Sequence, residues 1–293
     1  MLYVLENDYL KIAVDEAGAQ LYSLYSKKTN TEYLWQGDPA YWTGRAYNLF
    51  PFIGRMYEGF YRYRGEEYPS RAHGLARYFD FQLISRAENE LVFLFKDNEE
   101  TKKEYPFSFE FRVHFILNDA ELLVKYAVTN TDDRELICAF GGHPGINIPF
   151  GNGAFEDYYL EFDEKTPVLR QLLSESDRFM ADKAVPYELV DGVKMPLRHD
   201  LFEHDAVILE NTSSCVSIKS AKDNRYVTMR YPDFKFLGVW QVFGNSTPYV
   251  CLEPWTALPA IDGIVVDLEN KPNMTRVAPK ATSEVFYTLE IHE

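Results

Sequence analysis

The feature that most constrains the fold is a nine-residue run, residues 107–115, in which apolar and polar side chains alternate without exception. Side chains along a β-strand point to opposite faces in turn, so this alternation is typical of a strand with one buried face. The five apolar members then share that face: Phe107, Phe109, Phe111, Val113 and Phe115. A chain with such a strand needs a large apolar surface to cover it.

Strand-like segments recur along the whole chain. A second apolar segment, residues 122–128, follows after Asn118-Asp119-Ala120, which is typical of a hairpin connection. The other predicted strands are residues 10–14, 20–25, 91–95, 226–231, 236–242, 249–253 and 284–291. Helical signals are few: a short turn at 38–42, opened by a capping aspartate and a proline, and a short helix within 166–180. The pattern predicts an all-β protein, a large antiparallel β-sandwich with few short helices, forming one domain over residues 1–293.

The composition bears on partners and location. A formal net charge of -15 opposes binding to nucleic acid or to anionic membrane surfaces, so neither is an expected partner. Aromatic residues make up 16% of the chain and offer flat faces on which sugar rings stack. No apolar run approaches membrane-spanning length, and residues 1–8 do not resemble a secretory signal. Three cysteines in apolar surroundings, Cys138, Cys215 and Cys251, complete the expectation of a cytoplasmic protein with reduced thiols.

One carboxyl group stands out for its context. Glu253 ends an apolar run, residues 249–253, and Pro254 is expected to end the strand at that point. A carboxyl group in apolar surroundings gains proton affinity, which suits a general acid or base near neutral pH. The alternative is a solvated residue at the end of a strand.

Two histidines lie in glycine-containing turns. His73 precedes Gly74, and the arginines on either side of it oppose protonation of its imidazole. His143 is followed by Pro144, which forces an extended backbone at the histidine and fixes its direction. With Glu253, these imidazoles make a candidate acid–base site.

Three further residues are candidate ligand contacts. Arg55 follows Gly54 and offers a fork of donors for neighbouring oxygens, although an ion pair at a sheet edge explains it equally. Asp205 precedes a short apolar strand, where it either binds hydroxyl groups or caps a turn. Trp240 shares a face with Gly238, a spacing that leaves room for a flat ligand; the alternative is a tryptophan in the core.

Four segments in this order resemble the aldose-1-epimerase (galactose mutarotase-like) family, nearest to a divergent branch of short bacterial-type proteins. They are Gly54-Arg55, His73-Gly74, His143-Pro144-Gly145-Ile146-Asn147 and Cys251-Leu252-Glu253-Pro254-Trp255, and they span most of the chain. The resemblance implies a β-sandwich with an open sugar-binding cleft and a cofactor-independent isomerase. It further implies that Glu253 is the general base and His143 the general acid, with His73, Arg55 and, more loosely, Asp205 on the sugar; we add Trp240 and Trp255 as cleft walls.

The chain departs from the family pattern at two places, and at both the resemblance implies contacts with sugar hydroxyl groups. A Gly-Arg pair and a following Asn-Arg pair are common in the family, whereas this chain has Gly54-Arg55 alone. His73-Gly74-Leu75 replaces the His-Gly-Gly of the well-known galactose enzymes. These differences leave the identity of the sugar open rather than the acid–base pair.

The expected partner is therefore a monosaccharide, and the sequence does not indicate an oligomeric state. One alternative is a non-catalytic carbohydrate-binding or sensing protein on the same fold. A second is a mutarotase for hexose 6-phosphates, in which Arg45, Arg71 and Arg77 hold the anion. A third, a metal-dependent hydrolase that uses His73, His143 and Glu253, is less favoured because the histidines lack metal-ligand spacing. No cofactor or metal is expected.

Overall fold

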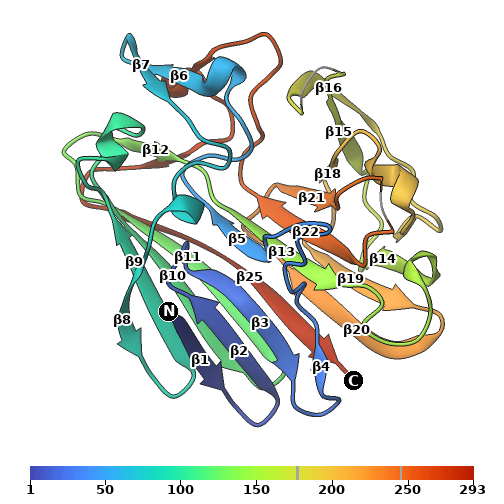
Figure 1. The fold of residues 1–293 in the computed structure, drawn as a ribbon. Helices are drawn as coiled ribbons and strands as arrows, with labels where there is room; N and C mark the ends of the chain where they lie inside the picture. Colours follow the sequence, from blue (N-terminus) through green and yellow to red (C-terminus); the bar gives the residue numbers. More distant parts are fainter. Residues whose placement is uncertain (176–177, 245) are drawn as a thin grey trace.

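The structure, a computed structural model, describes residues 1–175, 178–244 and 246–293 and is built mainly from antiparallel β-sheets, as predicted (Figure 1). The exception among the named strands is the parallel pairing of β23 with β6. A nine-stranded sheet contains, in spatial order, β17 (Lys194–Pro196), β14 (Tyr158–Phe162), β19 (Cys215–Ser220), β20 (Asp223–Arg230), β25 (Thr282–His292), β11 (Glu121–Asn130), β10 (Phe109–Asn118), β9 (Glu90–Lys96) and β8 (Gln82–Arg86). A seven-stranded sheet contains β16 (Met180–Pro186), β15 (Leu169–Leu173), β18 (Val207–Glu210), β21 (Phe236–Trp240), β22 (Tyr249–Trp255), β13 (Gly141–Asn147) and β5 (Ala46–Leu49).

Three smaller sheets complete the fold. They are β1 (Leu2–Glu6), β2 (Leu10–Asp15), β3 (Gln20–Ser26) and β4 (Thr31–Glu32); β12 (Leu136–Cys138) with β24 (Thr275–Val277); and β23 (Val266–Asp267), β6 (Phe60–Tyr63) and β7 (Glu66–Pro69). Figure 1 shows β6 and β7 standing apart from the large sheets.

Helix is confined, in the described ranges, to six 3-10 segments: η1 (Tyr57–Gly59), η2 (Ala76–Tyr78), η3 (Thr101–Lys103), η4 (Phe155–Asp157), η5 (His199–Phe202) and η6 (Leu268–Asn270). Among the described residues there is no helix with the length and apolar character needed to cross a bilayer.

The alternating run holds the core together. Throughout β10 the odd-numbered side chains are buried and the even-numbered ones are not, so the predicted face is confirmed. Phe111 stacks on Phe50, with ring centroids 4.3 Å apart. One buried cluster joins Phe111 to Ile12 of the four-stranded sheet and Val250 of the seven-stranded sheet. Each fully buried side chain of this size contributes about 1.5–3 kcal/mol, so the cluster fixes the sheets against one another.

The short helical turn predicted at 38–42 is confirmed, whereas the helix predicted within 166–180 is wrong. Residues 38–42 form a single turn, in which the amide N–H of Ala40 donates to the Asp38 carboxylate and those of Tyr41 and Trp42 donate to the Asp38 carbonyl. The capping aspartate is therefore confirmed, and the helical segment is limited to this one turn. Residues 169–173 within the second segment form β15, because they pair with β16 and β18 in the seven-stranded sheet. Residues 176–177 of that prediction lie outside the described residues.

Two smaller expectations also need correction. Pro254 does not end its strand, because the backbone stays extended and Trp255 still pairs with both Gly141 and Phe236. All three cysteines are free, but only Cys138 and Cys251 are buried, whereas Cys215 is partly exposed near one edge of its sheet.

Candidate active site

The register of the seven-stranded sheet brings two candidate groups face to face. His143 lies on β13 and Glu253 on the adjacent antiparallel strand β22. The pairs that bracket them are Gly141 with Trp255 and Gly145 with Cys251. In this register residue 143 lies opposite residue 253, and opposed residues in an antiparallel pair direct their side chains to the same face. The imidazole and the carboxyl group therefore meet on one face of the sheet.

This cross-strand row continues on both sides of the pair. Tyr47 of β5 pairs with His143, and Gly238 of β21 pairs with Glu253. A Cβ atom placed on Gly238 would lie only 3.0 Å from the Trp255 indole and 3.3 Å from Cβ of Glu253. The missing side chain at 238 thus makes room for the indole, and the prediction that it leaves space for a ligand is wrong.

The histidine and the carboxyl group form a buried pair. Nε2 of His143 lies 3.2 Å from Oε2 of Glu253, and their side chains are 8% and 2% exposed. Burial, followed by the charge of Asp205, raises the pKa of Glu253 well above its ordinary value. Burial, followed by His73 and Arg77, lowers the pKa of His143 well below its ordinary value. Because both shifts disfavour charge, a proton on the pair resides on the carboxyl group.

The second histidine is held by a reciprocal contact with Gly54. The amide N–H of His73 donates to the Gly54 carbonyl at 2.6 Å, and the Gly54 N–H donates to Nδ1 of His73 at 3.2 Å. Nδ1 is therefore an acceptor, and Nε2 carries the hydrogen of the neutral ring. Burial, then Arg77 and Arg55, lowers the pKa of His73 to about 3. The imidazole is thus neutral at physiological pH and offers a single N–H donor.

Aromatic rings surround the imidazole of His143. Trp42 stacks on the His143 ring with centroids 4.9 Å apart, while Trp240 and Tyr47 meet it edge-on at 5.5 and 6.2 Å. Above Tyr47 lies the guanidinium group of Arg77, 3.9 Å from the ring centre. The rings exclude water from the imidazole, which is why burial dominates its pKa.

Asp205 closes another side of the site. Its Oδ1 accepts a hydrogen bond from the Trp240 indole N–H at 2.8 Å and lies 3.7 Å from Nε of Arg178. Trp240 is only partly buried and forms part of the cavity wall, so it is not the core residue of the alternative interpretation.

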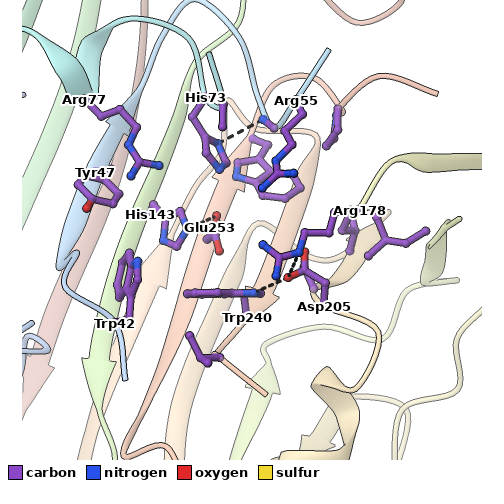
Figure 2. Close-up of a pocket in the computed structure, with 18 residues that line it drawn as sticks. Trp42, Tyr47, Arg55, His73, Arg77, His143, Arg178, Asp205, Trp240 and Glu253 are labelled. Carbon is purple, nitrogen blue, oxygen red and sulfur yellow. Dashed lines mark hydrogen bonds and ion pairs between the residues drawn. The ribbon is translucent and has the colours of Figure 1, made fainter. Parts of the chain in front are cut away.

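All of these groups line one cavity of about 330 Å³ (Figure 2). This volume falls within the range of about 300–1,000 Å³ typical of small-molecule sites. The structure brings together every residue that the sequence singled out for the site: Glu253, His143, His73, Arg55, Asp205 and Trp240, with Trp255.

The sequence analysis missed several cavity residues. They include Trp42, Tyr47, Arg178 and Pro259. Trp42 follows the capped turn at Asp38, but nothing in that turn indicates where its ring points. Tyr47 takes its place from the pairing of β5 with β13, which cannot be deduced from a single sequence.

Two of the three arginines expected to hold an anion lie elsewhere. Arg45 donates to Gln36 at 2.7 Å and stacks over the Tyr22 ring. Arg71 is paired with Glu104 at 2.5 Å. Neither lines the cavity, whereas Arg77 does so, together with Arg55 and Arg178. The arginine effect expected on His73 therefore comes from Arg77 and Arg55 rather than from Arg71.

One group of side chains has the composition of a metal site. The ligand atoms of His143, Cys251 and Glu253 lie within 4.8 Å of one another, and all three residues are buried. Among the described residues this is the set that combines donors in this way, and it differs from the predicted set because Cys251 takes the place of His73.

The comparisons with known proteins agree with this geometry. The model of a family described as aldose 1-epimerase matches residues 1–267. The chain belongs to the aldose 1-epimerase family. Two proteins of Lactococcus lactis subsp. lactis, "Protein LacX, plasmid" and "Protein LacX, chromosomal", are 34% and 33% identical to this chain over 302 residues, covering 99% of each sequence.

Solved structures place this member of the aldose 1-epimerase family among galactose mutarotase-like folds. A "galactose mutarotase related enzyme" from Lactobacillus acidophilus superposes with a TM-score of 0.92 at 34% identity, covering 100% of this chain and 98% of that one. A "galactose mutarotase-like protein" from Lactobacillus casei gives a TM-score of 0.94 at 30% identity, with both chains covered completely. The predicted family and fold are confirmed.

Proposed function

We propose that the protein interconverts the α and β anomers of an aldose by general acid–base catalysis, with Glu253 as base and His143 as acid. The observation that carries the proposal is the buried pair, with Nε2 and Oε2 3.2 Å apart, on a wall of a ligand-sized cavity. Anomer exchange needs proton transfers to and from one sugar, and these two groups are suited to supply them. Membership of the aldose 1-epimerase family supports the same reaction.

The reaction follows from the two groups. The Glu253 carboxylate takes the proton of the anomeric hydroxyl group while the His143 imidazolium protonates the ring oxygen, and the C1–O5 bond breaks to give the open-chain aldehyde. Rotation about C1–C2 presents the other face of the carbonyl group. The ring oxygen then attacks C1, returns its proton to His143, and the new anomeric hydroxyl group receives its proton from Glu253. No atom is gained or lost by the protein.

The pair must carry one proton for this cycle. Burial favours the neutral arrangement, with that proton on Glu253. Its transfer across the 3.2 Å contact gives an ion pair, in which Glu253 is deprotonated and His143 is protonated, as ring opening requires. The sugar hydroxyl groups then act as hydrogen-bond partners of these charges.

The surrounding residues are suited to hold the sugar. The Nε2–H of His73 and the guanidinium group of Arg55 are donors for ring hydroxyl groups, and Asp205 is an acceptor. Trp240 offers a flat wall for the apolar face of a pyranose. Each lines the same cavity as the acid–base pair.

Substitution Glu253→Gln tests the proposal, because the amide keeps the shape and loses the base. We expect the exchange rate, followed by polarimetry or by NMR of the two anomers, to fall by about 10²–10⁴-fold. Glu284→Gln is the matched control: Glu284 lies on β25 of the other large sheet and its side chain is 53% exposed. An unchanged rate in Glu253→Gln would favour the alternative, a carbohydrate-binding protein without catalysis.

A second candidate function, mutarotation of a sugar phosphate, is favoured by the charge of the cavity. Arg55, Arg77 and Arg178 line it in a chain whose net charge is -15, and the neutral state of His73 leaves the guanidinium groups as its cations. Rates on glucose and galactose compared with those on their 6-phosphates decide between the two. A strict requirement for the phosphate excludes the free sugar as substrate, and equal rates exclude a phosphate site.

A further inference from the structure

A second cleft lies behind the wall of the sugar cavity. It has a volume of about 490 Å³, and Pro259 lines both hollows. Lys271, at the end of η6, also lines the second cleft, and its Nζ points at the wall. The ammonium group donates to two consecutive backbone carbonyl oxygens, that of Leu258 at 2.8 Å and that of Pro259 at 3.3 Å.

The wall is the segment 256–262, which follows β22 and therefore the carboxyl group of Glu253. Its start is fixed by the Thr256 N–H, which donates to the Phe140 carbonyl at 3.0 Å. Its end is fixed at Ala260, whose N–H donates to the Arg55 carbonyl at 3.1 Å and whose carbonyl accepts from Met180 at 2.9 Å. Between these anchors, the ammonium group of Lys271 donates to the carbonyl oxygens of Leu258 and Pro259.

The wall bears directly on a sugar-contact residue. A Cβ atom placed on Gly54 would lie 2.5 Å from Cγ of Pro259, so the proline ring packs against the glycine backbone. Gly54 in turn exchanges two hydrogen bonds with His73, and Arg55 is its chain neighbour. A movement of Pro259 is therefore transmitted to both predicted sugar contacts.

We propose that Lys271 is a positioning residue for the sugar site: its ammonium group holds segment 256–262, and through Pro259 and Gly54 it fixes the directions of Arg55 and His73. The inference rests on the proposed function, since it assigns those two residues to the sugar. A charge-assisted bond to a carbonyl group is stronger than a neutral one, so the wall is held most firmly while the lysine is protonated.

The contact between the Lys271 ammonium group and segment 256–262, called the clamp below, depends on pH because of the surroundings of the lysine. Burial lowers the pKa of Lys271 to about 8. The other charged groups of the cleft are engaged separately or face solvent: Glu210 pairs with Lys235 at 3.1 Å, Asp267 caps η6, and Asp182 is exposed. Loss of the lysine proton therefore weakens the clamp slightly above physiological pH.

The first test needs neither sugar nor activity. The carbon-bound imidazole protons of His73 are followed by NMR between about pH 6.5 and 9.5 in the wild type, in Lys271→Arg, whose guanidinium group stays protonated, and in Lys271→Met. We expect an inflection near pH 8 in the wild type and none in either variant. An inflection retained in Lys271→Arg overturns the proposal, and so does a wild type without one.

The second test measures kcat and KM for anomer exchange. We expect Lys271→Met to raise KM about fivefold with a smaller change in kcat, because displaced binding groups weaken sugar contacts, and Lys271→Arg to restore KM near neutral pH. The control is Lys235→Met, which removes the other lysine of the same cleft and should leave KM unchanged. A normal KM in Lys271→Met overturns the proposal. An inactive wild type refutes the proposed function alone, because the NMR titration still decides the role of Lys271.

Discussion

His73 gives the sharpest quantitative prediction, because its burial has a measurable consequence for stability. Its pKa is about 3 in the folded protein, whereas an imidazole in an unfolded chain has a pKa of about 6.5. Below about pH 6.5 the unfolded chain binds a proton that the folded protein does not, so the free energy of unfolding decreases as the pH falls. The loss reaches at most ~1.4 kcal/mol per pH unit. Between pH 7.5 and 5 it amounts to about 2 kcal/mol for this residue.

The substitution His73→Gln removes the titrating group and keeps a neutral side chain. At pH 7.5 we expect the variant to be less stable by about 1 kcal/mol, because the hydrogen bond from Gly54 to Nδ1 is lost. At pH 5 the order is reversed, and the variant is the more stable protein by about 1 kcal/mol. Urea unfolding at the two pH values measures both differences.

His143, which is buried, and the carboxylates change stability with pH in the wild type and the variant alike. The difference in the free energy of unfolding between the wild type and the variant therefore changes with pH only through His73. A difference that is the same at pH 7.5 and pH 5 would refute the assignment of His73 as a residue kept neutral by burial.

Two further predictions concern the site. The pH profile of kcat/KM is expected to stay level as the pH falls through 6.5 and to decline only below it, because burial lowers the pKa of His143; a decline at alkaline pH follows loss of the proton shared with Glu253. An acid limb centred at or above pH 6.5 contradicts this. The substitution Gly54→Ala should destabilise the protein by about 1–3 kcal/mol and raise KM, because the glycine has φ +65° and its new Cβ would meet Pro259 at 2.5 Å. Thermal unfolding and steady-state kinetics check both effects, and an unperturbed variant would show that the wall moves aside freely.

Much of the fold was readable because it depends on local periodicity. The alternation at 107–115 determines which face of β10 is buried, and this holds irrespective of the neighbouring strands. The helix expected within 166–180 failed for the opposite reason. β15 exists because β16 and β18 supply hydrogen-bond partners, and partners distant in sequence leave no periodic signal in the segment itself.

The site divides in the same way. Glu253, His143 and His73 could be selected because each lies next to glycine or proline in an apolar segment, a local chemical signal. Trp42 could not, because its role depends on stacking over His143 after the sheet has formed. Pro254 also misled the analysis: lacking an N–H, it was expected to end its strand, yet β22 continues to Trp255.

Under the proposed function, the opposition of residues 143 and 253 makes catalytic activity a test of correct sheet assembly. If the pairing of β13 and β22 were shifted by one residue, one of the two side chains would lie on the opposite face of the sheet. The imidazole and the carboxyl group could then not act on the same sugar. Such a misfolded molecule would keep nearly all of its secondary structure and its bulk spectroscopic signature. A measurement of turnover would then distinguish molecules with the correct β13–β22 register from molecules with a shifted register, which circular dichroism cannot separate.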